Sequence, residues 1–499
     1  MGTPGAAPAG GPAGSGTTTG RYTQYYICYF LQLAGRCFTI YSKNLDKQAS
    51  PGVRLSNHLV DSHPPERAGE DNHSAQLGNH TVNKHNPDRD SMGDCGSGLG
   101  KQLSSKYTLV QTKTDRHGDM LSNYPIVPDP APLGSYAARD VVFLLKDIGP
   151  YVVEQGNEAR EKAMQSGRHY SEMLPIEYQP TREYIDLFHQ SLQETGRRLA
   201  LAAAIVAEQI MRKRGRRVAL VSLARAGTPA GVLIKRYLRC FYGLDAPHYS
   251  ISIIRDRGID VNAIIYILQR HPGCSIQFID GWTGKGAITR ELIKAVEDFE
   301  HKFGINSGTL IKDIAVLADP GHCANIFGTR DDFLIPSACL NATVSGLMSR
   351  TVLRDDLIGP LDFHGAKFYR NLARDDLSNY FVDTVAVYFA AVRDEARRML
   401  QHNPGLGLDA APAWLGRQET VRIQAEFGIG SINLVKPGVG ETTRVLLRRV
   451  PWKILVKDIK HADIKHVLLL ARDRGVPVEE YPHMSYCCCG LIKSMGDRT

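Results

Sequence analysis

Apolar positions change between two spacings along residues 181–318, and this change predicts a mixed α/β domain. Over residues 181–214 the apolar side chains recur at helical spacing and the segment ends on three basic residues, so we predict one long helix. Short apolar strands then alternate with amphipathic helices. We predict strands at 218–223, 249–254, 275–279 and 313–318, and helices at 230–242, 260–270, 290–303 and, further along the chain, 380–401. This alternation is typical of a parallel sheet with flanking helices.

The patterning also divides the chain into regions. Residues 1–133 are rich in Gly, Ala, Pro, Ser, His and Asn and have few apolar positions, so we predict a low-complexity, disordered tail. An alternative is that translation starts at Met92 and that residues 1–91 do not belong to the protein. We predict a folded domain over 134–400, a linker rich in Pro, Gly and Ala over 401–419, and a small α/β domain over 420–499.

Composition narrows the class of protein. A chain of 499 residues can hold two or three domains, and its net charge of +8 favours polyanionic partners. Ten cysteines show no framework spacing and we find no secretory signal, which predicts a cytoplasmic protein. The longest apolar run is too short to span a bilayer, so we expect no membrane partner. The sequence predicts no oligomeric state.

Two glycine-rich turns follow predicted strands, and each leads into a helix. The first turn comes after Asp280 and contains Thr283, Gly284, Lys285, Gly286 and Ala287; the second contains Arg225, Ala226, Gly227 and Thr228. Backbone N–H groups in such turns, together with the helix N-terminus, bind phosphate. Both turns should open at the carboxyl ends of the strands, which predicts a ligand with two phosphate groups. The alternative is that both are simply tight connections. The spacing excludes a nucleotide-hydrolysing P-loop.

The segment from about 135 to 389 resembles the type I phosphoribosyltransferases, in the branch found in tellurium-resistance and stress operons. The resemblance rests on residues 140–146, 169–175, 222–229, 278–286 and 319–323. It implies a type I phosphoribosyltransferase-like parallel sheet and Mg²⁺-dependent transfer from phosphoribosyl pyrophosphate (PRPP) to a base-like small-molecule acceptor. Asp280 and Arg225 would be catalytic, residues 283–287 would bind the 5′-phosphate, and residues 225–228 would bind pyrophosphate. Phosphate oxygens and water would complete the Mg²⁺ shell, so we predict no protein metal site.

Two alternatives to the transferase remain open. A domain that senses PRPP without chemistry is suggested by Ile279, which stands where these enzymes have an acid. A cysteine hydrolase is suggested because members of this branch have also been labelled StiP cysteine proteases. Its nucleophile would be Cys323, beside His322, or Cys339, but neighbours in an extended segment point to opposite faces. Residues 487–489 are three adjacent cysteines, which we interpret as buried thiols and not as a metal site.

The C-terminal region has a third glycine turn that leads into a helix. It resembles the RNA-binding domain shared by Pelota and the L7Ae kink-turn proteins, with a Gly where that family has Asn. The resemblance implies RNA as a partner. The implied contacts are Lys436, Gly438, Gly440, Glu441, Thr443, Arg444 and Arg448. The alternative is a small accessory domain with a solvated basic face.

Overall fold

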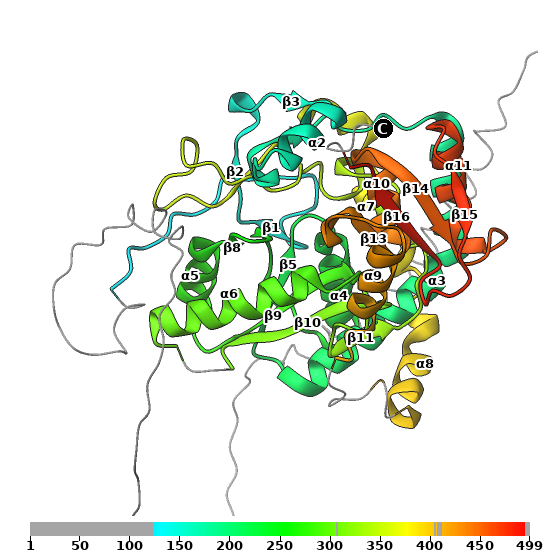
Figure 1. The fold of residues 1–499 in the computed structure, drawn as a ribbon. Coiled ribbons are helices and arrows are strands. Elements are labelled where there is room, and N and C mark those ends of the chain that lie inside the picture. Colours follow the sequence, from blue (N-terminus) through cyan, green and yellow to red (C-terminus); the bar gives the residue numbers. More distant parts are fainter. Residues whose placement is uncertain (1–122, 306–307, 404–405, 407–411, 495–499) are drawn as a thin grey trace, which may run out of the picture. The chain divides into compact units, whose positions relative to one another are not determined.

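A six-stranded sheet in which all neighbouring strands are parallel forms the centre of the molecule (Figure 1). The computed structural model describes residues 123–305, 308–403, 406 and 412–494, which belong to one unit. The predicted tail over 1–133 lies mostly outside the described residues, as does the proposed start at Met92. The central sheet confirms the predicted mixed α/β class.

The strand order of this sheet is β1-β6-β5-β9-β10-β11. Its strands are β1 (Val142–Phe143), β5 (Val218–Leu223), β6 (His248–Ile251), β9 (Ser275–Trp282), β10 (Leu310–Ala318) and β11 (Ile326–Thr329). From β5 the chain continues to β6, toward the β1 edge of the sheet, and from β9 it continues to β10, toward the β11 edge. The carboxyl ends of β5 and β9 therefore lie side by side at the point where the winding reverses, which is where α/β sheets bind ligands.

Four of the helices described in this region match the four predicted over 181–303, whereas α2 was not predicted. They are α2 (Asn157–Gln165), α3 (Arg182–Arg214), α4 (Gly227–Tyr242), α5 (Val261–Arg270), α6 (Ala287–Phe303), α7 (Ser378–Ala386) and α8 (Phe389–His402). Thr181 caps α3 by accepting from the N–H of Tyr184, and Asp260 caps α5 in the same way. Helix α3 is buried along much of its length, because its apolar positions pack on the sheet. None of the described helices is long and apolar enough to cross a membrane.

Short strand pairs complete this part of the molecule. They are β2 (Lys146–Asp147) with β12 (Gly365–Ala366), β3 (Glu154–Gln155) with β4 (Leu174–Pro175), and β7 (Ile253–Ile254) with β8 (Gly258–Ile259). The strand predicted over 249–254 is therefore divided between β6 and β7. Strand β9 is longer than predicted, because it continues through Gly281 to Trp282 and delays the start of the turn.

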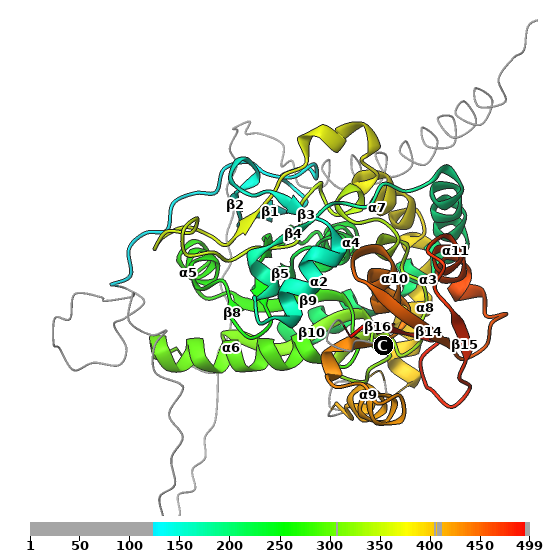
Figure 2. The ribbon, with the colours of Figure 1, turned by 45° about the horizontal axis from the view of Figure 1, so that its top comes forward.

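A second sheet of four strands, in the order β13-β16-β14-β15, forms the C-terminal region. Its elements are α9 (Leu415–Glu426), β13 (Val435–Pro437), α10 (Val439–Arg448), β14 (Pro451–Val456), α11 (Lys465–Asp473), β15 (Val478–Glu480) and β16 (Cys488–Ile492). The cysteine-rich segment is thus a buried central strand that the sequence analysis missed. Helix α10 lies near α2 in both views (Figures 1 and 2), where Arg449 forms an ion pair with the buried Glu161.

Candidate functional site

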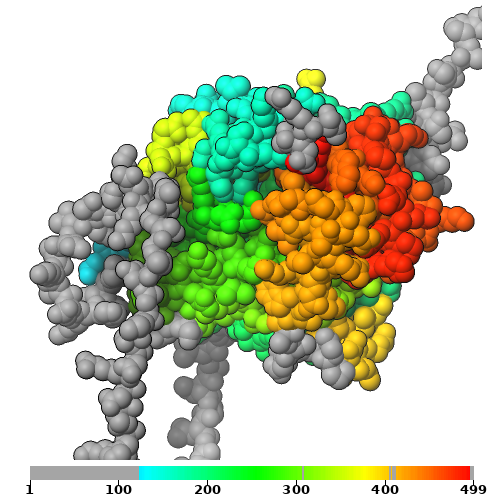
Figure 3. Space-filling model, viewed as in Figure 1, coloured from blue at the N-terminus to red at the C-terminus, as the bar shows by residue number. Residues whose placement is uncertain are grey.

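A pocket of about 780 Å³ opens where the carboxyl ends of β5 and β9 meet α2 and α10. On the face in Figure 3, the cyan, green and orange parts of the chain meet in this region. Three separately predicted motifs contribute to its lining. The predicted residues that line it are Arg225, Asp280, Thr283, Gly284, Lys285, Gly286, Ala287, Lys436, Glu441, Arg444 and Arg448. Residues far apart in the sequence therefore share one site.

Helix α6 begins in this pocket without a side-chain cap. Its N-cap residue is Gly286, whose φ of 73° is in the left-handed region that glycine adopts at little cost. The helix N-terminus carries partial positive charge that an anion can neutralise. Thr283 has a different role from the one predicted, because its hydroxyl donates to the buried carboxylate of Asp319 and its N–H to the carbonyl of Ala318.

Lys285 extends from the same turn toward the C-terminal region. Its ammonium group donates to the carbonyls of Ile432 and Val435, the latter at 3.1 Å. Burial, together with the nearby charges of Lys436 and Arg255, lowers the pKa of Lys285 to about 6. An anion that enters the pocket would favour the protonated form of this side chain.

Arg225 lies at the bottom of the second turn and is only 7% exposed. One terminal nitrogen, Nη1, donates to Glu177 at 2.7 Å and to the carbonyl of Met348 at 2.8 Å. The other, Nη2, is buried without a hydrogen-bond partner. A buried guanidinium N–H with no acceptor is costly, so this position has unused capacity to bind an anion.

Two carboxylates in the pocket have opposite pKa shifts. Burial raises the pKa of Asp280 to about 6, although Arg444 and the N–H of Gly281 oppose the shift. Burial would also raise the pKa of Glu441, but Arg444, at 2.5 Å, and Lys436 outweigh it and lower the pKa to about 2. Asp280 can therefore exchange a proton near neutral pH, whereas Glu441 stays ionised and holds Arg444 in place.

Positive charge dominates the pocket, since ten Lys or Arg side chains line it against three carboxylates. Four arginines that were not predicted to bind a ligand also contribute to the lining, namely Arg160, Arg168, Arg350 and Arg449. They come from separate segments and belong to no motif, and only tertiary packing brings them together. Tyr170 contacts two cations of the lining, with the guanidinium carbon of Arg350 at 4.5 Å and that of Arg255 at 5.3 Å from its ring centre.

Six residues with predicted contacts do not line the pocket. They are Ala226, Gly227, Thr228, Gly438, Gly440 and Thr443. Gly227 is packed against β9, because a Cβ there would meet the carbonyl of Ile279 at 2.5 Å. The hydroxyl of Thr443 donates to the carbonyl of Val439 and contacts His466, both at 2.7 Å. These glycines and threonines position helices, and their predicted contacts with pyrophosphate or RNA have no counterpart in the pocket.

The N-terminus of α10, which the sequence analysis predicted to contact RNA, is capped from within the chain. Asp332 accepts hydrogen bonds from the N–H groups of Val439, at 2.9 Å, and Cys487, at 2.8 Å. Gly440 packs against Trp282, since a Cβ there would come within 2.3 Å of its ring. A carboxylate thus occupies the position that the resemblance gives to RNA, and α10 faces the pocket with its later residues.

The cysteines differ in their access to a base. Cys323 and Cys339 are buried, and burial raises the pKa of each thiol to about 12. Cys323 donates to the carbonyl of Gly321 at 3.1 Å. Within the described residues, neither of these two thiols forms a hydrogen bond with a histidine.

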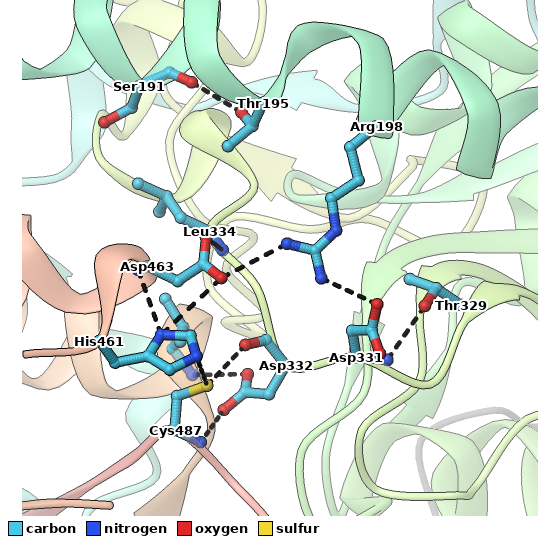
Figure 4. Close-up of polar contacts among 11 residues, drawn as sticks. Ser191, Thr195, Arg198, Thr329, Asp331, Asp332, Leu334, His461, Asp463 and Cys487 are labelled. Carbon is cyan, nitrogen blue, oxygen red and sulfur yellow. Dashed lines mark hydrogen bonds and ion pairs between the residues drawn. The ribbon is translucent and has the colours of Figure 1, made fainter. Parts of the chain in front are cut away.

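Cys487 contacts a histidine (Figure 4). Its sulfur lies 3.8 Å from Nε2 of His461, and Nδ1 of that ring lies 3.9 Å from Asp463. The Cys487 thiol also lies 2.9 Å from the carbonyl of Asp332, and burial raises its pKa to about 12. The order thiol, imidazole, carboxylate resembles that of nucleophilic cysteine sites, but both contacts are longer than a hydrogen bond between nucleophile and base. Nδ1 of His461 instead accepts the backbone N–H of Asp463 at 3.2 Å.

Comparisons with known proteins define two regions. Residues 134–386 match the model of the family described as tellurite-like stress resistance cysteine protease StiP, and residues 414–494 match the PELOTA RNA binding domain. A relative from Acinetobacter baylyi, named "Cysteine protease StiP", is 33% identical over 355 residues, which cover 69% of this chain and 90% of the relative. No solved structure gave a significant match.

These findings correct the predicted activity. The matched family and relative are described as cysteine proteases, so the prediction of a PRPP-dependent phosphoribosyltransferase was wrong, and the PRPP-sensing alternative has no support. The base-like acceptor depended on that reaction and is dropped with it. The type I phosphoribosyltransferase fold is not confirmed, although the central parallel sheet is. Within the described residues, no group of three His, Cys, Asp or Glu side chains could hold a metal ion, so we derive no step through Mg²⁺. The matched region and the relative together show that the chain belongs to the StiP family, with a C-terminal PELOTA domain.

Proposed function

We propose that this member of the StiP family binds RNA in the pocket between the central sheet and the PELOTA domain. The observation that carries the proposal is the composition of the lining, with eight Arg and two Lys side chains against three carboxylates. Phosphate contacts supply most of the affinity of proteins for nucleic acids. The match to the PELOTA RNA binding domain supports RNA as the polyanion.

The PELOTA domain would contribute through the later turns of α10. Arg444 and Arg448 lie on this helix and line the pocket, and Lys436 precedes it on β13. Arg444 also stacks on Trp282 of the central sheet, with 4.5 Å between its guanidinium carbon and the ring centre. Both parts of the chain therefore form one binding surface, and RNA would contact them together.

The test is the salt dependence of binding to a fluorescent single-stranded RNA of roughly ten nucleotides. For single strands, log K falls with log salt by about 0.7 for each phosphate neutralised. We expect R444M and R448M each to weaken binding and to reduce this slope by about 0.7. R472M is the matched control, because Arg472 is an exposed arginine of the same domain outside the pocket. Equal losses in all three variants, or no RNA binding by the wild type, would refute the proposal.

A second candidate function is thiol-dependent peptide hydrolysis, which the name of the relative suggests. The observation that favours it is the contact of Cys487 with His461, with Asp463 beside the second ring nitrogen. Because the thiol has a raised pKa, Nε2 of His461 would take its proton as sulfur attacks a peptide carbonyl carbon. The ring proton must then lie on Nδ1, so Nδ1 would have to release the backbone N–H of Asp463 that it accepts at 3.2 Å. The proton then passes to the leaving amine, and water hydrolyses the thioester. This order of steps requires no preformed thiolate.

Hydrolysis can be tested with a fluorogenic casein substrate. C487S and H461A should each abolish turnover, because one removes the nucleophile and the other removes the base. C323S is the control, because Cys323 is buried like Cys487 but has no hydrogen bond to a histidine among the described residues. Full activity in C487S would exclude Cys487 as the nucleophile, and loss only in C323S would transfer the role to Cys323.

A further inference from the structure

Residues that line the pocket keep several buried N–H donors without partners. These donors are Nε of Arg160, Nη2 of Arg225, Nε1 of Trp282 and Nε of Arg448. All four are donors, and within the described part of the chain none of the pocket's buried side-chain acceptors is left unpaired in this way. Arg160 and Arg225 are 1% and 7% exposed, so water does not readily satisfy them. Because only donors lack partners, the group that would satisfy them must supply hydrogen-bond acceptors.

The same residues form a dense cluster of positive charge. Arg160, Arg225, Arg350 and Arg448 lie close enough that the charges of Arg160 and Arg225 lower the pKa of Arg350, and those of Arg225 and Arg350 lower the pKa of Arg448, in addition to the effect of burial. The carboxylates nearby are already engaged. Glu177 binds Arg225 at 2.7 Å, and Glu161 binds Arg449 at 2.6 Å. Four guanidinium groups thus lie near one another, and the two nearby carboxylates are each already paired with an arginine.

An internal phosphodiester of RNA would compensate this cluster poorly, since it brings one negative charge and two free oxygens. A terminal phosphate brings between about 1.5 and 2 charges and three acceptor oxygens, and a terminal triphosphate brings more. The pocket volume of about 780 Å³ is in the range that encloses a ligand of one or two nucleotides and is too small for a duplex. The end of a strand fits these limits better than its middle.

We infer that the pocket binds the 5′-polyphosphate end of an RNA strand, with the terminal phosphates against Arg225 and Arg448 and the rest of the strand leaving past α10. This inference rests on the RNA binding proposed above and specifies which part of the RNA enters. The uncapped N-terminus of α6 adds partial positive charge to the same pocket. The α10 side of the pocket, with Arg444 and Lys436, would then meet internal phosphates.

The experiment compares RNAs of one sequence that carry a 5′-hydroxyl, a 5′-monophosphate or a 5′-triphosphate, each with a dye at the 3′ end. Fluorescence anisotropy at fixed salt should show binding that tightens about tenfold or more from hydroxyl to triphosphate. In R225M and R448M this preference should fall to about twofold or less. R472M should keep it. Circular dichroism and urea unfolding of each variant establish that it is folded. If R225M does not fold, R448M alone tests the inference, because Arg448 is less buried than Arg225.

Each outcome has a distinct meaning. Equal affinity for the three ends would overturn the inference and leave RNA binding intact, whereas no binding to any of them would overturn the proposed function itself. Free nucleoside triphosphate and inorganic pyrophosphate serve as competitors. If free nucleoside triphosphate binds as tightly as triphosphorylated RNA, the pocket belongs to a small phosphorylated molecule and the RNA end is refuted. Competition only at far higher concentration supports the RNA end.

Discussion

Asp332 caps helix α10 by accepting a hydrogen bond from the backbone N–H of Val439 at 2.9 Å. Asp332 belongs to the segment that follows the central sheet, and Val439 opens the helix of the PELOTA domain. The second oxygen of the same carboxylate accepts from the N–H of Cys487 at 2.8 Å. One side chain therefore joins the two regions and fixes the direction in which α10 faces the pocket.

We expect D332A to lower the free energy of unfolding by about 1–3 kcal/mol, because two buried N–H groups lose their acceptor. Urea unfolding at neutral pH measures this change. D331A is the matched control, since Asp331 is exposed and its ion pair with Arg198 should contribute less than about 1 kcal/mol. Equal stability of D332A and the wild type would show that the cap contributes nothing.

The ion pair between Glu161 and Arg449 makes a second prediction. Both guanidinium contacts are short, at 2.6 and 2.9 Å, and Glu161 is fully buried. Removing one partner of a buried pair leaves the other charge uncompensated, so E161A should cost about 3–5 kcal/mol in urea unfolding. In contrast, E395A removes the partner of the exposed Arg197 and should cost less than about 1 kcal/mol. Similar costs for the two variants would contradict this account.

RNA binding should depend on pH through Lys285. Its pKa of about 6 in the free protein means that the side chain is largely neutral at pH 8, whereas nearby phosphate would favour its protonated form. Binding then takes up a proton, so affinity should fall as pH rises above 6. An RNA with a 5′-hydroxyl avoids titration of a terminal phosphate. In K285M the fall should be flatter, and an unchanged pH profile in that variant would exclude Lys285 as the cause.

Thiol reactivity should follow burial. Among the described cysteines, Cys240 is exposed, whereas Cys323, Cys339 and residues 487–489 are buried. Because the thiolate is the reactive form and burial raises the pKa of Cys487, iodoacetamide at neutral pH should modify Cys240 first. Mass spectrometry of timed samples, with a urea-unfolded control, measures the order. Rapid modification of Cys487 in the folded protein would show that its thiol is already ionised.

Much of the fold could be predicted because local patterns determine it. Thr181 and Asp260 cap the helices that were predicted to begin at these residues, and strand β5 has the predicted bounds. Strand β16 was missed because its run of cysteines suggested chemistry, although the residues are central and buried. The helix predicted over 380–401 is divided into α7 and α8 between Ala386 and Phe389. No turn signal in the sequence marks that break.

The site was predictable only in part. Lys285, Arg225 and Arg444 were predicted to line a binding site, because each lies in or just after a glycine turn that leads into a helix. Arg160 and Arg350 lie in no motif and reach the pocket through packing of distant segments. Asp332 carries no signal in the sequence that links it to α10. The predicted activity was wrong because it was carried over from the phosphoribosyltransferases through two anion turns and a family resemblance, and similar turns occur on folds with different chemistry.

The most direct test of the central claim is to map ultraviolet crosslinks between the protein and bound RNA by mass spectrometry. Two aromatic residues, Tyr170 and Trp282, line the pocket, whereas Trp452 is an exposed aromatic of the PELOTA domain outside it. We predict crosslinks in peptides that contain Tyr170 or Trp282, and their loss when R448M weakens binding. Crosslinks confined to the peptide of Trp452 would place RNA elsewhere and contradict the proposed site.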